Sequence, residues 1–206
     1  MAYLIGIAGG SGSGKTTLAR ALAARLKPSV IIAEDDYYRC ATTIPGFDAR
    51  AHDFDALGAK DMARLAADLG ALRAGKAIDK PRYDYVTHTR RAEGEHVAPA
   101  DYLIVEGILA LADPDVRATY DLAVWLDTPG DLRLLRRVRR DVAERGRSIE
   151  SVLDQYERTV RTSFLRHAQA QADGADLVLD AETLCHELDV MVARVLAAMP
   201  QRRKRK

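Results

Sequence analysis

The 206-residue chain contains no asparagine, only two cysteines and no apolar run of 18 residues. Without asparagine it cannot form the Asn-Lys-x-Asp loop by which regulatory GTPases recognise guanine. Cys40 and Cys185 show no metal-ligand spacing and no disulfide framework, as is typical of a protein in a reducing compartment. Because no segment could span a membrane and no basic segment precedes the first apolar run, we expect a cytoplasmic protein with no membrane partner.

The charges are nearly balanced, with 31 Lys and Arg against 30 Asp and Glu and a formal net charge of +1. Residues 201–206 hold five of the positive charges, so the rest of the chain is net negative. This balance does not indicate a nucleic-acid binder, and we do not expect nucleic acid as a partner. The length suits one domain over residues 1–200, followed by a basic tail that we expect to be disordered.

Residues 9–16 match the pattern G-x-x-x-x-G-K-[ST] at every fixed position. A short apolar run at residues 3–8 precedes this glycine loop and a helical pattern follows it, which is the order that a phosphate-binding loop requires. Backbone N–H groups would bind phosphate, Lys15 would reach the β- and γ-phosphates, and the Thr16 hydroxyl would ligate Mg²⁺. The predicted ligand is a nucleoside triphosphate. The residues assigned to it are Gly9, Gly10, Ser11, Gly12, Ser13, Gly14, Lys15, Thr16 and Thr17.

Short apolar runs and helical patterns alternate along the chain, which predicts an α/β fold with a five-stranded parallel sheet flanked by helices. Residues 78–97 differ, because alternating tyrosines follow a proline there, and we predict a small β-hairpin insertion. After the first run, the apolar runs lie at 30–32, 102–105, 122–126 and 177–179. The helical patterns after the one that follows the glycine loop lie at about 58–74, 130–144, 148–172 and 182–199.

Acidic residues follow the second and third predicted strands, where ligands bind in sheets of this kind. Glu106 comes after four apolar residues and is our candidate for holding Mg²⁺ opposite Thr16. Asp35 is our candidate general base, which would accept the proton of an attacking hydroxyl during phosphoryl transfer. The sequence does not separate Asp35 from its neighbour Asp36, and a turn or N-cap role is the alternative for both.

Residues 133–147 contain seven arginines and end in Glu-Arg-Gly-Arg between two helical patterns. We interpret this segment as an Arg-rich lid that neutralises the transferred phosphoryl group and excludes water. The arginines assigned to this function are Arg137, Arg140, Arg145 and Arg147. We expect the others, Arg133, Arg136 and Arg139, to lie on a solvated face and to pair with nearby acids.

Taken together, these segments resemble the uridine kinase (uridine–cytidine kinase) family of P-loop nucleoside kinases over most of the chain. The most specific segments are Tyr-Asp-Tyr-x-x-His-x-Arg at 83–90 and Glu-Arg-Gly-Arg at 144–147. Glu-Asp-Asp-Tyr-Tyr-Arg at 34–39 and Val-Glu-Gly-Ile-Leu-Ala at 105–110 also match.

The resemblance implies Mg²⁺-dependent phosphorylation of the 5′-hydroxyl of uridine or cytidine in pyrimidine salvage, with ATP or GTP as donor. It implies Asp35 as the base, with Lys15, Arg145 and Arg147 as the other catalytic residues and Arg140 at the ATP. We assign Thr16, Glu106 and Asp35 to the metal. The nucleoside pocket would contain Tyr38, Tyr83, Tyr85, His88, Arg137 and Gln155. The resemblance also implies a homo-oligomer, a tetramer in this family.

The chain departs from the family in a loop that carries an Asn-Phe/Tyr-Asp-His-Pro motif, whose aromatic ring and Asp contact base and ribose. Here the loop is shorter, and Phe47-Asp48 is the nearest match, followed by Ala49-Arg50. We therefore assign Phe47 and Asp48 to the substrate and expect a looser grip on ribose, with weak discrimination between uridine and 2′-deoxyuridine.

Two other functions fit part of this pattern. A related P-loop kinase acting on pantothenate, a sugar phosphate or another nucleoside would share Lys15, Thr16, Asp35 and Glu106, and the segment at 83–90 argues against it. A nucleotide-dependent RNA-binding protein would use the basic tail. Deleting residues 201–206 tests this possibility, because a small-molecule kinase would keep its turnover.

Overall fold

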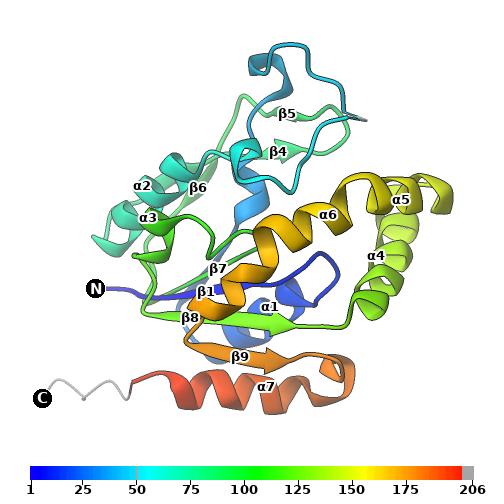
Figure 1. The fold of residues 1–206 in the computed structure, drawn as a ribbon. Helices are drawn as coiled ribbons and strands as arrows, with labels where there is room; N and C mark the ends of the chain where they lie inside the picture. Colours follow the sequence, from blue (N-terminus) through cyan, green and yellow to red (C-terminus); the bar gives the residue numbers. More distant parts are fainter. Residues whose placement is uncertain (50, 201–206) are drawn as a thin grey trace, which may run out of the picture.

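A computed structural model describes residues 1–49 and 51–200. At its centre is a parallel sheet of five strands in the order β2-β7-β1-β8-β9, which confirms the predicted fold (Figure 1). Each strand matches a predicted apolar run to within a few residues. The strands are β1 (Tyr3–Ala8), β2 (Ser29–Ala33), β7 (Tyr102–Gly107), β8 (Leu122–Asp127) and β9 (Leu177–Asp180).

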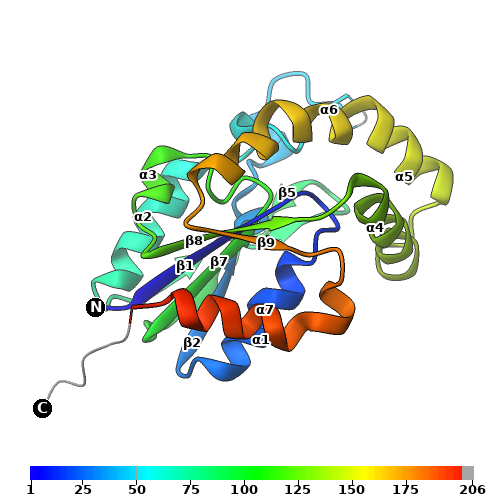
Figure 2. The same ribbon diagram turned by 60° about the horizontal axis from the view of Figure 1, so that its bottom comes forward.

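Helices cover both faces of the sheet, as its apolar strands require. On one face α1 (Lys15–Arg25) and α7 (Leu184–Ala198) pack against the sheet and each other, as Figure 2 shows. On the other face α2 (Met62–Arg73) and α3 (Pro114–Arg117) close a second apolar cluster around Trp125. The central strands are therefore buried on both sides, and polar side chains gather only at the strand ends.

The segment after β8 leaves the carboxyl edge of the sheet. It forms α4 (Gly130–Arg145), bends at Gly146, which has a φ of 64°, and continues as α5 (Ile149–Gln155) and α6 (Arg161–Ser163) (Figure 1). The helical pattern predicted for residues 148–172 is confirmed, although the type of helix changes along it. π-helical turns at Tyr156–Val160 and Phe164–Ala168 flank α6, and a 3-10 turn at Gln169–Gly174 ends the segment.

The insertion at 78–97 is an antiparallel ribbon, which agrees with the predicted hairpin. Its base pairs β3 (Ile78–Lys80) with β6 (Glu95–Val97), and its tip pairs β4 (Tyr83–Asp84) with β5 (Thr89–Arg90). The described part of the chain between β2 and α2 forms 3-10 turns at Glu34–Tyr37, Ala41–Thr43 and Leu57–Ala59. In the part of the chain that the structure describes, no helix has the length and apolarity needed to cross a membrane. The basic tail at 201–206 lies outside the described residues.

Candidate active site

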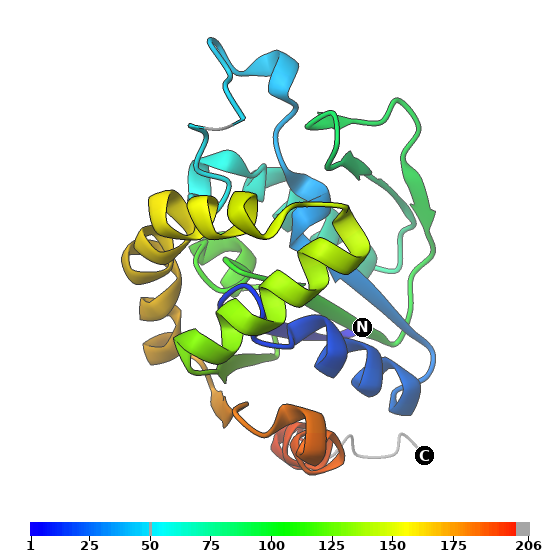
Figure 3. The same cartoon turned by 90° about the vertical axis from the view of Figure 1, so that its right-hand side faces the viewer.

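The glycine loop joins β1 to α1 and passes behind α4 in the view of Figure 3. Gly12 and Gly14 adopt left-handed conformations, with φ of 83° and 99°, and a Cβ at Gly12 would collide with the main chain of Arg133. The Lys15 ammonium donates to the carbonyl of Gly10 over 3.1 Å. Burial lowers the pKa of Lys15, although nearby carboxylates oppose this effect. The loop therefore has the backbone shape and the buried cation that phosphate binding requires.

Thr16 and Glu106 meet at the carboxyl edge of the sheet, because β1 and β7 are neighbours. The Thr16 hydroxyl donates to Glu106 Oε1 over 2.8 Å. Hard oxygen donors of this kind suit Mg²⁺, which takes few protein ligands and completes its shell with water and phosphate oxygens. Within residues 1–49 and 51–200, no three His, Cys, Asp or Glu side chains form a metal site by themselves. The donor set thus fits a cation that is bound together with a nucleotide.

The two neighbouring carboxylates in the turn after β2, Asp35 and Asp36, pair with different lysines. Asp35 accepts a hydrogen bond from the Lys60 ammonium at 2.9 Å and feels the charges of Lys15 and Arg145. Burial opposes ionisation of Asp35, but these cations outweigh it and lower its pKa. Asp36 instead pairs with Lys80 of the antiparallel ribbon, and burial raises its pKa. The geometry favours Asp35 as the carboxylate that faces the phosphate-binding groups.

Lys60 is a residue that sequence reasoning missed. Its side chain is completely buried and pairs with Glu34 as well as Asp35. Its sequence context, Leu57-Gly58-Ala59-Lys60, carries no motif, so only the fold reveals this pairing.

Aromatic rings gather between the turn after β2 and the tip of the ribbon. The rings of Tyr38 and Tyr83 lie 5.0 Å apart, and His88 stacks on Phe54 at the same centroid distance. Burial, followed by the charge of nearby His52, lowers the pKa of His88. Most of the predicted nucleoside residues thus lie together. Tyr38 and Tyr83 are nearly buried, whereas Tyr85, which contacts Tyr83, and His88 keep exposed surface that can face a planar ligand.

The predicted pair Phe47-Asp48 lies at the border of this aromatic cluster, where the Phe47 ring is 5.8 Å from that of His88. A second Phe-Asp pair, seven residues further along the chain, lies deeper. Phe54 contacts Tyr38 edge to face, and Asp55 is only 9% exposed and lies within reach of the Arg137 charge. Burial raises the pKa of Asp55, partly offset by that charge. Sequence reasoning overlooked this pair, although the repeated Phe-Asp was a readable signal.

Four of the arginines surround Asp141, whose carboxylate is fully buried. The ion-pair distances are 3.6 Å from Arg137, 2.7 Å from Arg140, 3.5 Å from Arg145 and 3.6 Å from Arg147. These are the four arginines that we assigned to function from the sequence, so the structure brings them together. Two of these arginines, Arg137 and Arg147, also donate hydrogen bonds to Gln155, another predicted site residue.

Arg137 links α4 to the glycine loop and to α5. Its guanidinium donates to the Ser11 hydroxyl over 3.0 Å and to the Gln155 side chain over 2.8 Å. Arg147 donates to the same Gln155 oxygen over 2.6 Å, while the Arg145 guanidinium lies 5.2 Å from the centre of the Tyr85 ring. The α4–α5 corner is thus tied to both the phosphate side and the aromatic side of the site.

The expectation of a solvated face was wrong for Arg133 and incomplete for Arg136. Arg133 is 6% exposed, and its guanidinium lies 3.7 Å above the Phe164 ring and against the glycine loop. Arg136 donates to main-chain carbonyls of Ala181 and Glu182, which fastens α4 to the turn after β9. Only Arg139 is exposed as expected. Counting charges cannot show that an arginine packs on an aromatic ring through its flat face.

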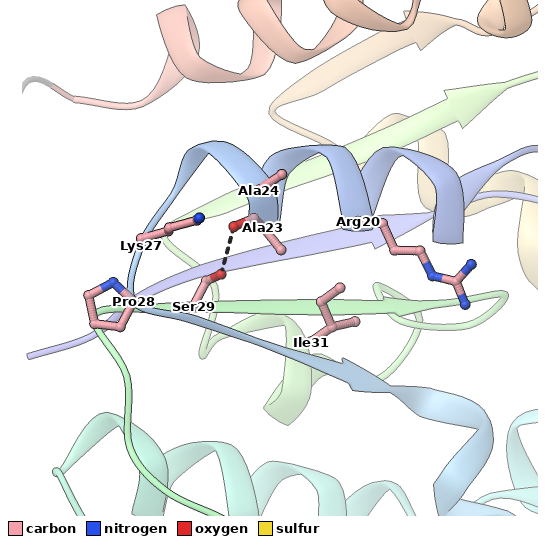
Figure 4. A pocket seen from close by; sticks show the side chains of 7 residues that line it. All are labelled: Arg20, Ala23, Ala24, Lys27, Pro28, Ser29 and Ile31. Atoms are coloured by element: carbon pink, nitrogen blue, oxygen red, sulfur yellow. Dashed lines mark hydrogen bonds between the residues drawn. The ribbon is translucent and has the colours of Figure 1, made fainter.

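An open pocket on the outer side of β2 and α1 holds none of the predicted site residues. Figure 4 shows its lining, in which the Ser29 hydroxyl donates to the carbonyl of Ala23 over 3.1 Å. A second pocket, beside α5, is lined partly by Arg147 and Gln155 and adjoins the arginine cluster. The predicted site residues therefore lie at the carboxyl edge of the sheet and not in the first pocket.

Comparisons with known proteins find similar chains among kinases. A uridine kinase of Proteus mirabilis (strain HI4320) is 40% identical over 182 residues, which cover 85% of each chain. The uridine kinase of Ligilactobacillus salivarius (strain UCC118) is 37% identical over 204 residues, or 98% of this chain and 96% of that protein.

Among solved structures, a possible uridine kinase from Bacillus stearothermophilus shares the fold with a TM-score of 0.56 at 23% identity, covering 87% of this chain and 89% of that one. A family profile described as "Phosphoribulokinase / Uridine kinase family" matches residues 4–184. The resemblance drawn from the motifs is thus confirmed, and the chain belongs to the phosphoribulokinase and uridine kinase family.

Proposed function

We propose that this protein transfers the γ-phosphoryl group of ATP to the 5′-hydroxyl of uridine or cytidine. One observation carries the proposal: Asp35 lies within electrostatic reach of Lys15 in the glycine loop and Arg145, and also of Tyr38 and Tyr83 in the aromatic cluster. A base in that position can serve an acceptor held by the rings and a donor held by the loop. The similarity to curated uridine kinases supports the same substrates.

In the reaction, the acceptor oxygen attacks the γ-phosphorus and Asp35 takes the hydroxyl proton as the bond to ADP breaks. The lowered pKa of Asp35 keeps its carboxylate ionised and ready to accept that proton at neutral pH. Lys15 and the backbone of the glycine loop bind the phosphates. Thr16 and Glu106, with Asp35 as a further ligand, would hold Mg²⁺, which neutralises charge on the β- and γ-phosphates.

The arginine cluster completes the donor side. The cluster around Asp141 adjoins the glycine loop, because Arg137 contacts Ser11. We propose that Arg145 and Arg147 stabilise the charge of the transferred group when the α4–α5 corner closes over the site, and that Arg140 binds the ATP.

On the acceptor side, we propose that Tyr38, Tyr83, Tyr85 and His88 hold the pyrimidine ring, with Phe47 at the outer border. We also propose that Asp55, rather than Asp48, binds ribose hydroxyls, because Asp55 is the buried carboxylate beside the aromatic cluster and Arg137. A buried carboxylate that loses its hydroxyl partner rejects the analogue. With Asp55 in this role, we expect the protein to discriminate clearly against 2′-deoxyuridine, in place of the weak discrimination expected from the sequence.

The test is an ADP-release assay with ATP and Mg²⁺ against uridine, cytidine, 2′-deoxyuridine, adenosine, pantothenate and sugar phosphates. The proposal expects turnover of uridine or cytidine and much weaker turnover of the others. Turnover of pantothenate or a sugar phosphate alone would favour a related kinase with another acceptor.

Three further expectations belong to the same proposal. The chain forms one domain over residues 1–200, it assembles as a homotetramer, and it works in the cytoplasm with no membrane or nucleic-acid partner. Mass photometry of the purified protein tests the assembly. An RNA-binding measurement on the protein with and without residues 201–206 tests the role of the tail.

A further inference from the structure

Lys60 lies at the centre of a buried chain of charges beside the proposed base. Its side chain has no exposed surface, and neither has that of Glu34, with which it forms an ion pair. The same ammonium donates to Asp35 Oδ1 over 2.9 Å and lies 4.5 Å from the centre of the Tyr38 ring. An ammonium so deep in a protein is costly unless all of its partners are in place.

This chain of charges is anchored at both ends. Glu34 accepts a hydrogen bond from the backbone N–H of Leu109 over 2.8 Å, and its side chain fills the space that a Cβ at Gly107 would occupy. The backbone of Lys60 forms an antiparallel bridge with Tyr38. The carboxylate of Asp35 is thereby tied to the loop after β7, the strand that carries Glu106.

The neighbouring acid shows a different arrangement. Asp36 pairs with Lys80, which also reaches the exposed side chain of Glu95 3.3 Å away. Lys80 is nearly buried too, but it belongs to the ribbon and does not touch Asp35. Lys60 and Lys80 are thus both buried and each pairs with one of two consecutive acids, and of this pair Lys60 is the one that contacts the proposed base.

We propose that Lys60 is a positioning residue that holds the Asp35 carboxylate toward the acceptor hydroxyl. The proposal rests on the proposed function, since it takes Asp35 as the base. Asp35 also lies within electrostatic reach of Lys15 and Arg145. Without Lys60 its carboxylate would turn to those cations, which would misplace the base and occupy groups needed by the triphosphate.

The first test compares Lys60→Met with the double variant Glu34→Gln/Lys60→Met. The double variant removes both members of the buried pair, so it leaves no uncompensated charge on Glu34 and keeps the fold. We expect kcat to fall by between about tenfold and a hundredfold in both, with the KM for the acceptor changed by less than about threefold. Lys80→Met is the matched control, and its kcat should stay within about twofold of the wild type.

A second test separates positioning from a purely structural role. In Lys60→Ala, ethylammonium can enter the cavity and supply the missing cation, so it should restore part of kcat in a saturable way. Tetramethylammonium, which has no N–H donor, should not.

Three results would overturn the proposal: a double variant with kcat near that of the wild type, an equal loss in Lys80→Met, or a loss in Lys60→Ala that ethylammonium does not relieve. The proposed function fails by a different result, namely absence of pyrimidine nucleoside turnover in the wild type. The Lys60 comparison is then made with whichever acceptor the wild type phosphorylates.

Discussion

The substitution Asp35→Asn tests the identity of the base, because it keeps the shape of the side chain and removes its basicity. Loss of a general base lowers kcat by about 10² to 10⁴, which corresponds to about 3 to 5 kcal/mol of the activation barrier. The acceptor KM should change little, since we propose that the aromatic rings and Asp55, rather than Asp35, hold the nucleoside.

The same substitution should disturb the fold only slightly. The Asn oxygen can still accept the hydrogen bond from Lys60, and Lys60 remains paired with Glu34. We expect a loss of about 1 to 2 kcal/mol in the free energy of unfolding, below the 3 to 5 kcal/mol typical of an unpaired buried charge. The assay is steady-state ADP release with uridine, accompanied by urea unfolding. Asp36→Asn is the control, and if it loses activity while Asp35→Asn retains it, the assignment of the base is refuted.

The remaining predictions concern the donor, the lid, the ribose and the fold. Lys15→Ala should abolish measurable transfer with little change in stability, and near-normal turnover would contradict the phosphate-binding role. Arg147→Ala should lower kcat more than it weakens ATP binding to the free enzyme, measured by calorimetry; equal effects would mark an ordinary ATP-binding residue. Asp55→Asn should reduce the preference for uridine over 2′-deoxyuridine by about tenfold or more, whereas Asp48→Asn should leave it unchanged. The lowered pKa of His88 means that the folded state binds this proton less readily than the unfolded state. The free energy of unfolding should therefore fall as the pH drops below about 6.5. In the His88→Gln variant the free energy of unfolding should fall less over the same pH range.

The fold could be predicted from the sequence because its signals are local. Each central strand is one short apolar run, the glycine loop is contiguous, and the Arg-rich helix follows a recognisable strand. Glu106 could be placed near Thr16 before any coordinates, since the carboxyl ends of neighbouring parallel strands meet at one edge. General rules of parallel sheets were sufficient there.

The missed residues depend on contacts between distant segments. Lys60 pairs with Asp35, 25 positions away, across a stretch of 3-10 turns whose path no periodicity predicts. Arg133 was assigned to a solvated face because it belongs to an arginine-rich segment, whereas its guanidinium packs on Phe164, in a π-helical turn far along the chain. Asp55 was overlooked because Phe47-Asp48 comes first in the loop. The burial of Asp55, which distinguishes Phe54-Asp55 from Phe47-Asp48, is visible only in the folded protein. Local pattern determined the elements, and tertiary packing determined which polar side chains are enclosed.

The most direct test of the proposed function is the product formed from uridine by the purified protein with ATP and Mg²⁺, identified by phosphorus NMR and mass spectrometry. We expect one equivalent of ADP for each equivalent of uridine 5′-monophosphate, and loss of both products in Asp35→Asn. ADP release without a phosphorylated nucleoside, or phosphorylation of a non-nucleoside acceptor with uridine and cytidine untouched, would contradict the proposed function.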